Sequence, residues 1–130
     1  MTVKIPQAVA AQMRAHAKEE LPNECCGLLV GRRGFVQRAV RARNLEAGPT
    51  RYLIDPQDHF AAMRAARGEG LHVIGAYHSH PAGTTEPSPS DIAEASGGAD
   101  FLYVIVSSVT GAMTGFLVKN GLVILTELAE

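Results

Sequence analysis

The sequence predicts an α/β protein in which a mixed β-sheet is flanked by helices on both faces. The chain has 130 residues, the size of one domain at roughly 100–200 residues per domain. Segments with helical and strand-like patterns alternate along it, and helices between strands are typical of a sheet covered on both faces. A continuous apolar run over 73–77 also predicts a strand at a buried central position. We therefore expect a single domain over 1–130.

The N-terminal third predicts a helix followed by a β-hairpin. Apolar residues recur at helical spacing over 7–20, and Pro6 suits the first turn of a helix. Apolar segments over 24–31 and 35–43 predict two strands, because the GRRG stretch between them is typical of a hairpin turn.

Two further helices are predicted from the residues that begin them. One should begin after Asp55, where an N-cap residue precedes a proline, and end at Gly68. The other should begin at Ser88 and Asp91, whose spacing is that of a capping box, and end at 97–98.

The C-terminal half predicts four more strands. The last two are joined by an Asn-Gly turn, which is a strong hairpin signal. Their expected ranges are 71–80, 101–107, 112–119 and 122–126. The predicted order of elements is therefore αββαβαβββ.

Composition and charge exclude two classes of protein. Hydrophobic residues make up 46% of the chain and charged residues 19%, which argues against a disordered protein. Lys and Arg total 12, Asp and Glu total 13, and the net charge is -1. A general nucleic-acid-binding protein is therefore not expected, because neutralising phosphates requires an excess of basic residues.

The positive charge is concentrated in one part of the chain, which we call the basic strip. Two interpretations are open: a solvated face, or a surface that meets an acidic partner. The strip consists of Arg32, Arg33, Arg38, Arg41, Arg43 and Arg51.

The two cysteines, Cys25 and Cys26, are adjacent and exclude a disulfide framework. Neighbours on a strand point to opposite faces, so they cannot easily share a metal ion, and small core residues are the favoured interpretation. A redox role is left open. No apolar run approaches the ~20 residues needed to span a bilayer, and Met1–Pro6 lacks the pattern of a signal segment. We expect a soluble cytoplasmic protein that does not bind membranes.

Two histidines at the end of the predicted central strand are the first candidates for chemistry. His78 and His80 point to the same face, about 6.6–6.8 Å apart along the strand. Two imidazoles at this separation can converge on one ion, although two histidines alone are a weak signal and are often incidental. Asp91 follows beyond a loop that could bring its carboxylate back to the strand end. With a water, the three would form an open, catalytic type of zinc site. Helix capping alone would also explain Ser88 and Asp91.

Glu24 has two interpretations as well. It is either a solvated acid at a strand end or a carboxylate that moves a proton for a metal-activated water. The other three histidines, His16, His59 and His72, have no partner at ligand spacing. We expect them to be ordinary surface or half-buried residues.

Together these residues resemble a known motif. Glu24, then YHSHP over 77–81, then PSPSD over 87–91, is similar to the JAMM signature of the MPN metallopeptidases, with the expected six residues between the proline and the serine. The resemblance extends over nearly the whole chain. Because only one short helix follows the motif, the chain resembles the short prokaryotic members. Eukaryotic members carry an extra insertion there.

The resemblance implies a role for each motif residue. His78, His80 and Asp91 would ligate Zn²⁺, with water as the fourth ligand. Glu24 would act as general base and then as general acid. Ser88 would position or stabilise the oxyanion of the tetrahedral intermediate, as a neutral donor near developing charge. The implied fold is the MPN/JAMM fold, a three-layer architecture like that of the cytidine deaminases. Deamination is not expected, because the chain lacks the H-x-E and P-C-x-x-C motifs of deaminases.

The implied function is that of a zinc-dependent peptidase or isopeptidase. It would hydrolyse the bond after the C-terminal Gly-Gly of a ubiquitin-like or sulfur-carrier protein, with a zinc-activated water as nucleophile. Two alternatives are a non-catalytic MPN scaffold that only binds partners, and a zinc amidohydrolase acting on small substrates. The resemblance allows a homodimer, which no segment requires. The sequence does not identify the carrier, the pathway or the bond, which is a peptide, isopeptide or carrier-cysteine bond.

Overall fold

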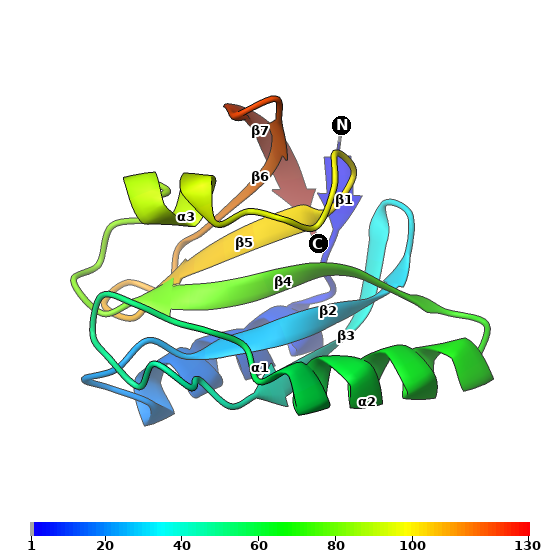
Figure 1. The fold of residues 1–130 in the computed structure, drawn as a ribbon, viewed down its shortest axis with the longest axis horizontal. Coiled ribbons are helices and arrows are strands. Elements are labelled where there is room, and N and C mark those ends of the chain that lie inside the picture. Colours follow the sequence, from blue (N-terminus) through cyan, green and yellow to red (C-terminus); the bar gives the residue numbers. More distant parts are fainter. Residues whose placement is uncertain (1) are drawn as a thin grey trace.

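The structure, a computed structural model, describes residues 2–130. These residues form seven strands and three helices (Figure 1). No helix among them is long and apolar enough to cross a membrane. The elements are β1 (Thr2–Lys4), α1 (Gln7–Glu19), β2 (Cys26–Arg32), β3 (Phe35–Ala42), α2 (Pro56–Gly68), β4 (His72–His80), α3 (Pro89–Ala93), β5 (Leu102–Ser107), β6 (Met113–Lys119) and β7 (Leu122–Ala129).

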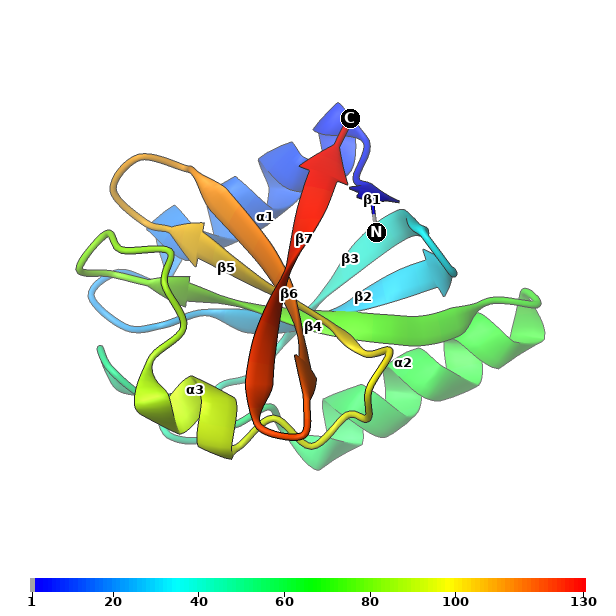
Figure 2. The same cartoon turned by 90° about the horizontal axis from the view of Figure 1, so that it is seen from above.

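The seven strands form one mixed sheet that closes into a barrel. The strand order is β1-β3-β2-β4-β5-β6-β7. The sheet closes because β1 pairs in parallel with both β3 and β7, and Figure 2 shows β1 beside the end of β7. The pair β4 and β5 is also parallel, and the remaining neighbours are antiparallel. The predicted mixed sheet with helices is confirmed. The strand β1 and the closure of the sheet were not predicted.

The largest core cluster lies on the inner side of this barrel. It contains residues of α1, and Met13 of that helix is fully buried. Every strand also contributes side chains to this cluster, so α1 packs against the inward-facing side chains of the barrel. The contributions from the strands include Val3, Leu29, Val36, Tyr77, Val104, Leu117 and the partly buried Leu128.

The helix α2 packs on the outer side of the same strands. Leu28 and Leu29 are neighbours in β2 and therefore point to opposite faces. Leu29 joins α1 in the inner cluster, whereas Leu28 packs with Ala62 of α2. Val30, on the same face as Leu28, packs with Ala66 one turn further along α2. Figure 2 accordingly shows α1 and α2 on opposite sides of β2 and β4. The strands between the two helices belong to a closed barrel rather than to an open middle layer.

Two local predictions were wrong. The helix that begins after Ser88 ends at Ala93 instead of 97–98. The segment after it packs against the outer side of the sheet, where the Gly97 amide donates a hydrogen bond of 2.9 Å to the Tyr103 hydroxyl. His16 is expected at the surface or half-buried, but it is only 4% exposed. Its Nδ1 lies 2.8 Å from the hydroxyl of Tyr77 in the core. By contrast, both cysteines are buried and free, as small core residues should be.

Most of the basic strip takes part in ion pairs. Four of its six arginines lie against carboxylates of this chain, so their charge is largely compensated within the molecule. The pairs are Arg38–Glu69, Arg41–Glu19, Arg43–Asp55 and Arg51–Glu94.

Candidate metal centre

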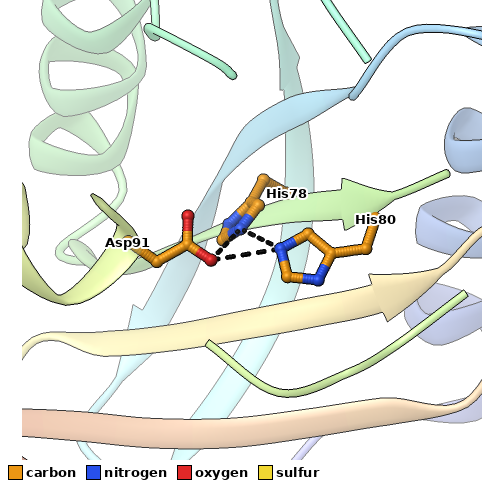
Figure 3. Close-up of side chains that lie close together, drawn as sticks. All are labelled: His78, His80 and Asp91. Atoms are coloured by element: carbon orange, nitrogen blue, oxygen red, sulfur yellow. Dashed lines mark hydrogen bonds and ion pairs between the residues drawn. The ribbon is translucent and has the colours of Figure 1, made fainter. Parts of the chain in front are cut away.

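The end of β4 carries the two candidate histidines. His78 and His80 are 1% and 7% exposed, because β4 is hydrogen-bonded to β2 on one side and to β5 on the other. Asp91 comes from α3, beyond the loop that follows β4. Figure 3 shows its carboxylate directed at both imidazole rings. The structure therefore brings these three side chains together, as the sequence predicted.

The three ligand atoms form a nearly equilateral triangle. His78 Nε2 lies 3.2 Å from His80 Nε2. Asp91 Oδ2 lies 3.2 Å from the first nitrogen and 3.1 Å from the second. Nitrogen and oxygen ligands about 2.0–2.1 Å from a tetrahedral zinc ion are about 3.3 Å from one another. The triangle therefore fits three of the four positions around such an ion, and the residues present fit zinc.

The hydrogen bonding of His80 also favours a cation at this point. His80 Nδ1 lies 3.1 Å from the carbonyl oxygen of Thr84. A carbonyl oxygen only accepts, so Nδ1 carries the proton. In a neutral ring Nε2 then holds a lone pair, which faces the carboxylate of Asp91 across 3.1 Å. A metal ion or an added proton is needed between two such acceptors.

The electrostatics favour an ionised Asp91 and a neutral His78, whereas His80 holds a proton more readily than a free imidazole does. Burial lowers the pKa of His78 below its ordinary value, against the opposing effect of Asp91. Burial raises the pKa of Asp91, but hydrogen bonds from His78 and His80 outweigh it and hold the pKa well below the usual range. Burial also lowers the pKa of His80, but Asp91 more than offsets this and the pKa is raised. A metal ion requires an ionised carboxylate and neutral imidazoles of its ligands, so binding at this point would displace a proton held between His80 and Asp91.

Asp91 is held in place by a capping box at the start of α3. The Ser88 hydroxyl accepts a hydrogen bond from the Asp91 amide at 3.1 Å, and the Ser88 amide donates to Asp91 Oδ2 at 2.9 Å. The same carboxylate oxygen faces both histidines. The capping interpretation and the ligand interpretation of Asp91 are therefore compatible, because the cap fixes the oxygen at the point where the rings converge.

Glu24 lies just before β2 and is not the solvated acid that one interpretation expected. It is 3% exposed, and its Oε1 is buried without a hydrogen-bond partner. Burial raises the pKa of Glu24 to about 7, with Asp91 adding to the rise and His80 opposing it. A buried carboxyl group with a pKa near neutrality, close to a candidate metal centre, is suited to take up and release a proton.

Tyr52 is a site residue that the sequence did not suggest. Its ring stacks on the imidazole of His78, with centroids 4.2 Å apart and planes inclined by 18°. The same tyrosine lines a cavity of about 810 Å³ between α2, β4 and the segment after α3. No local pattern in the sequence indicates which ring such a residue will contact.

Comparison with known proteins identifies relatives along most of the chain. Residues 6–118 match the family described as prokaryotic homologs of the JAB domain. The chain is 38% identical over 122 residues to a probable TtuB-protein conjugate cleaving protease of Thermus thermophilus, covering 93% of this chain and 79% of that protein. It is 35% identical over 98 residues to the CysO-cysteine peptidase of Mycobacterium tuberculosis, covering 74% of this chain and 66% of that protein.

Two solved structures share the fold. The solution structure of a protein from Desulfitobacterium hafniense has a TM-score of 0.88 at 32% identity, covering 98% of this chain and 91% of that chain. A JAB1/MPN domain protein from Archaeoglobus fulgidus has a TM-score of 0.62 at 18% identity, covering 100% and 97% of the two chains. The fold is thus that of the JAMM/MPN class. Since the match spans most of its length, the chain belongs to the prokaryotic JAB-domain family.

Proposed function

We propose that this chain is a zinc-dependent peptidase or isopeptidase acting on a ubiquitin-like or sulfur-carrier protein. The observation that carries the proposal is the convergence of two imidazole nitrogens and one carboxylate oxygen near a buried, unpaired carboxyl group. The names of the relatives support the substrate class, since one is described as a probable TtuB-protein conjugate cleaving protease and the other as a CysO-cysteine peptidase. The bond cleaved is the one after the C-terminal Gly-Gly of the carrier.

In this proposal His78, His80 and Asp91 hold the zinc ion. Zinc in such an open site polarises a carbonyl group and makes water a good nucleophile near neutral pH. The metal set is drawn from β4 and from the first turn of α3, both of which are fixed by backbone hydrogen bonding. This rigidity suits a site that must keep one coordination position for an exchangeable ligand.

Glu24 and Ser88 carry out the proton transfer and the stabilisation of charge. Glu24 takes the proton from the attacking water and delivers it to the leaving amine as the C–N bond breaks. The Ser88 oxygen accepts from the Asp91 amide and lies 3.1 Å from the Ser90 Oγ. When the Ser90 hydroxyl is the donor of that pair, the Ser88 hydrogen remains available to donate. In this role it donates to the carbonyl oxygen of the substrate as negative charge develops there.

The cavity beside Tyr52 supports an extended peptide as the substrate segment. Its volume of about 810 Å³ lies within the usual range for ligand sites, about 300–1,000 Å³. It is lined largely by apolar side chains, and Tyr52 links it to His78. We place the residues that precede the cleaved bond in this cavity, within the single domain formed by residues 1–130.

The experiment that tests this function measures metal content and cleavage together. Mass spectrometry of the purified protein should find about one zinc per chain, and His78→Ala should lose it. The wild-type protein should also cleave a Gly-Gly-tailed carrier with a C-terminal extension, and should leave dipeptides intact. Absence of zinc after reconstitution would contradict the proposal and favour a non-catalytic scaffold. Equal activity on dipeptides would favour an amidohydrolase of small substrates.

A further inference from the structure

The two candidate histidine ligands are oriented in different ways. The ring of His80 is fixed by the hydrogen bond between its Nδ1 and the Thr84 carbonyl oxygen. Metal-binding histidines are usually oriented by a bond of this kind from the second ring nitrogen. Within residues 2–130, Nδ1 of His78 makes no such bond. Its ring lies instead against Tyr52, with the two rings 4.2 Å apart and nearly parallel.

The loop that carries the stacked tyrosine is held by hydrogen bonds of the Asn44 side chain. Asn44 Nδ2 donates to the carbonyl oxygens of Glu24 and Arg51, at 3.0 Å and 3.1 Å. Asn44 Oδ1 accepts from the amides of Glu46 and Leu53, at 3.0 Å and 2.9 Å. Two of these partners are the residues on either side of the tyrosine. All four hydrogen-bonding positions of the asparagine side chain are therefore used to fix this loop.

A second contact ties the same loop to the helix that carries Asp91. Arg51, the residue before the tyrosine, pairs with Glu94 at the end of α3 across 3.4 Å. Both side chains are more than half exposed, so this pair adds little stability on its own. Glu94 nevertheless lines the same cavity as Tyr52. The loop that carries Tyr52 is therefore held by Asn44 and by the Arg51–Glu94 pair.

We propose that Tyr52 is a positioning residue that orients the imidazole of His78 for metal binding, and that Asn44 holds Tyr52 in that position. The stacked ring takes the place of the missing hydrogen bond from Nδ1 and restricts rotation of the imidazole. His78 Nε2 is thereby kept at the point where His80 and Asp91 converge. This inference rests on the proposed function, because it assumes that the three residues bind a metal.

The first test compares two substitutions of the tyrosine. Tyr52→Leu removes the stacked ring, and Tyr52→Phe keeps it. Zinc affinity is measured by competition with a chromophoric chelator. We expect Tyr52→Leu to weaken zinc binding about 10-fold or more, the usual effect of losing a partner of a metal-binding histidine. Tyr52→Phe should stay within about threefold of wild type. Leu53→Ala, which changes the next residue along the same cavity wall, is the matched control and should not alter zinc affinity.

Measurements on the metal-free protein distinguish a positioning role of Tyr52 from a purely structural one. If the tyrosine positions His78, Tyr52→Leu should lower zinc affinity by more than any change in the thermal stability of the metal-free protein explains. We expect Tyr52→Leu to change kcat of the zinc-saturated enzyme less than it changes zinc affinity. Equal zinc affinity of Tyr52→Leu and wild type would overturn the inference. A wild-type protein that binds no zinc would instead refute the metal site, so the two failures are distinguishable.

The second test examines whether Asn44 acts through the tyrosine. Asn44→Asp keeps both acceptor bonds and removes both donor bonds, and should weaken zinc binding. In a background of Tyr52→Leu the same substitution should have little further effect, because the ring that it positions is absent. Additive losses of zinc affinity in the double variant would overturn this part of the inference. If Tyr52→Leu does not fold, Asn44→Asp and Tyr52→Phe in the stable protein still test the positioning role.

Discussion

The backbone amide of Cys25 donates a hydrogen bond of 2.8 Å to the side-chain hydroxyl of Ser79. The Ser79 amide returns one to the Cys25 carbonyl oxygen at 3.1 Å. Cys25 follows Glu24, and Ser79 lies between the two candidate histidines. In the structure, its two bonds fix the backbone beside Glu24 against the strand that carries the candidate ligands.

Replacement of Glu24 should separate metal binding from catalysis. Glu24→Gln removes the carboxylate that accepts the proton but none of the proposed ligands. We expect zinc content to stay at the wild-type level and kcat to fall by about 10²–10⁴-fold. Glu20→Gln is the matched control, since Glu20 is an exposed acid nearby in the sequence. Full activity in Glu24→Gln would remove Glu24 from the proposed role.

The same residue should make the stability of the metal-free protein depend on pH. The pKa of Glu24 is about 7 in the folded protein and about 4.3 in an unfolded chain. Between these values the folded state binds more protons than the unfolded state, so this group lowers stability as pH rises. Glu24→Gln should therefore gain thermal stability relative to wild type between pH 5 and pH 8. A gain of about 4 °C corresponds to about 1 kcal/mol in a domain of this size. If Tm of Glu24→Gln and Tm of wild type differ by the same amount at pH 5 and at pH 8, this would contradict the burial of the Glu24 charge.

Substitutions at Ser88 should separate the helix cap from the donor to the substrate. Ser88→Ala loses both, and is expected to lower stability by about 1 kcal/mol and kcat by about 10²–10³-fold. Ser88→Asp can still cap the helix but has no hydrogen to donate, so stability should recover while activity does not. Thermal unfolding and steady-state kinetics on the two variants measure this. Recovery of both properties in Ser88→Asp would assign the residue to capping alone.

The basic strip should contribute little to substrate binding. Arg38 and Arg41 pair with Glu69 and Glu19, so their charges are already compensated. The double variant Arg38→Ala with Arg41→Ala should leave KM for a carrier substrate within about twofold at low salt. The loss of stability should stay below about 1 kcal/mol per pair, as for other exposed pairs. A KM that rises several-fold, and does so less at high salt, would restore the strip as a docking surface.

Two glycines offer a matched pair of stability predictions. A Cβ at Gly27 would clash with the Tyr77 ring and lie 2.5 Å from the Val40 carbonyl oxygen. Gly27→Ala should therefore destabilise the protein by about 3 kcal/mol, because the backbone must move. At Gly68, the last residue of α2, a Cβ would meet nothing within 4 Å. Gly68→Ala should stabilise by about 0.5–1 kcal/mol. Denaturant unfolding of both variants measures the difference, and a tolerated Gly27→Ala would contradict this packing.

The parts of the fold set by local physics were predictable from the sequence. The parity of a strand places His78 and His80 on one face. The N-cap patterns locate the starts of the two later helices, and the Asp55 side chain indeed accepts from the Gln57 amide. Both rules depend only on near neighbours along the chain, so they hold whatever the rest of the molecule does.

The parts that depend on distant partners were not predictable. A strand as short as Thr2–Lys4 has no recognisable pattern, and it forms because two other strands offer it hydrogen-bonding groups. The stacking of Tyr52 on His78 depends on a loop whose shape is fixed by one asparagine. The site is therefore predictable in its three candidate ligands and unpredictable in the residues that support them.

The closure of the barrel has a consequence for biosynthesis. Thr2 is paired with Glu127, a residue 125 positions further along the chain. A ribosome releases β1 well before β7, so β1 must wait with one side unpaired until β7 has emerged. The β2–β3 hairpin can form early, because its pairing is local. The seam between the two ends of the chain is thus the last part that can be completed. A nascent chain stalled before β7 would present an unfinished sheet to chaperones and to proteases.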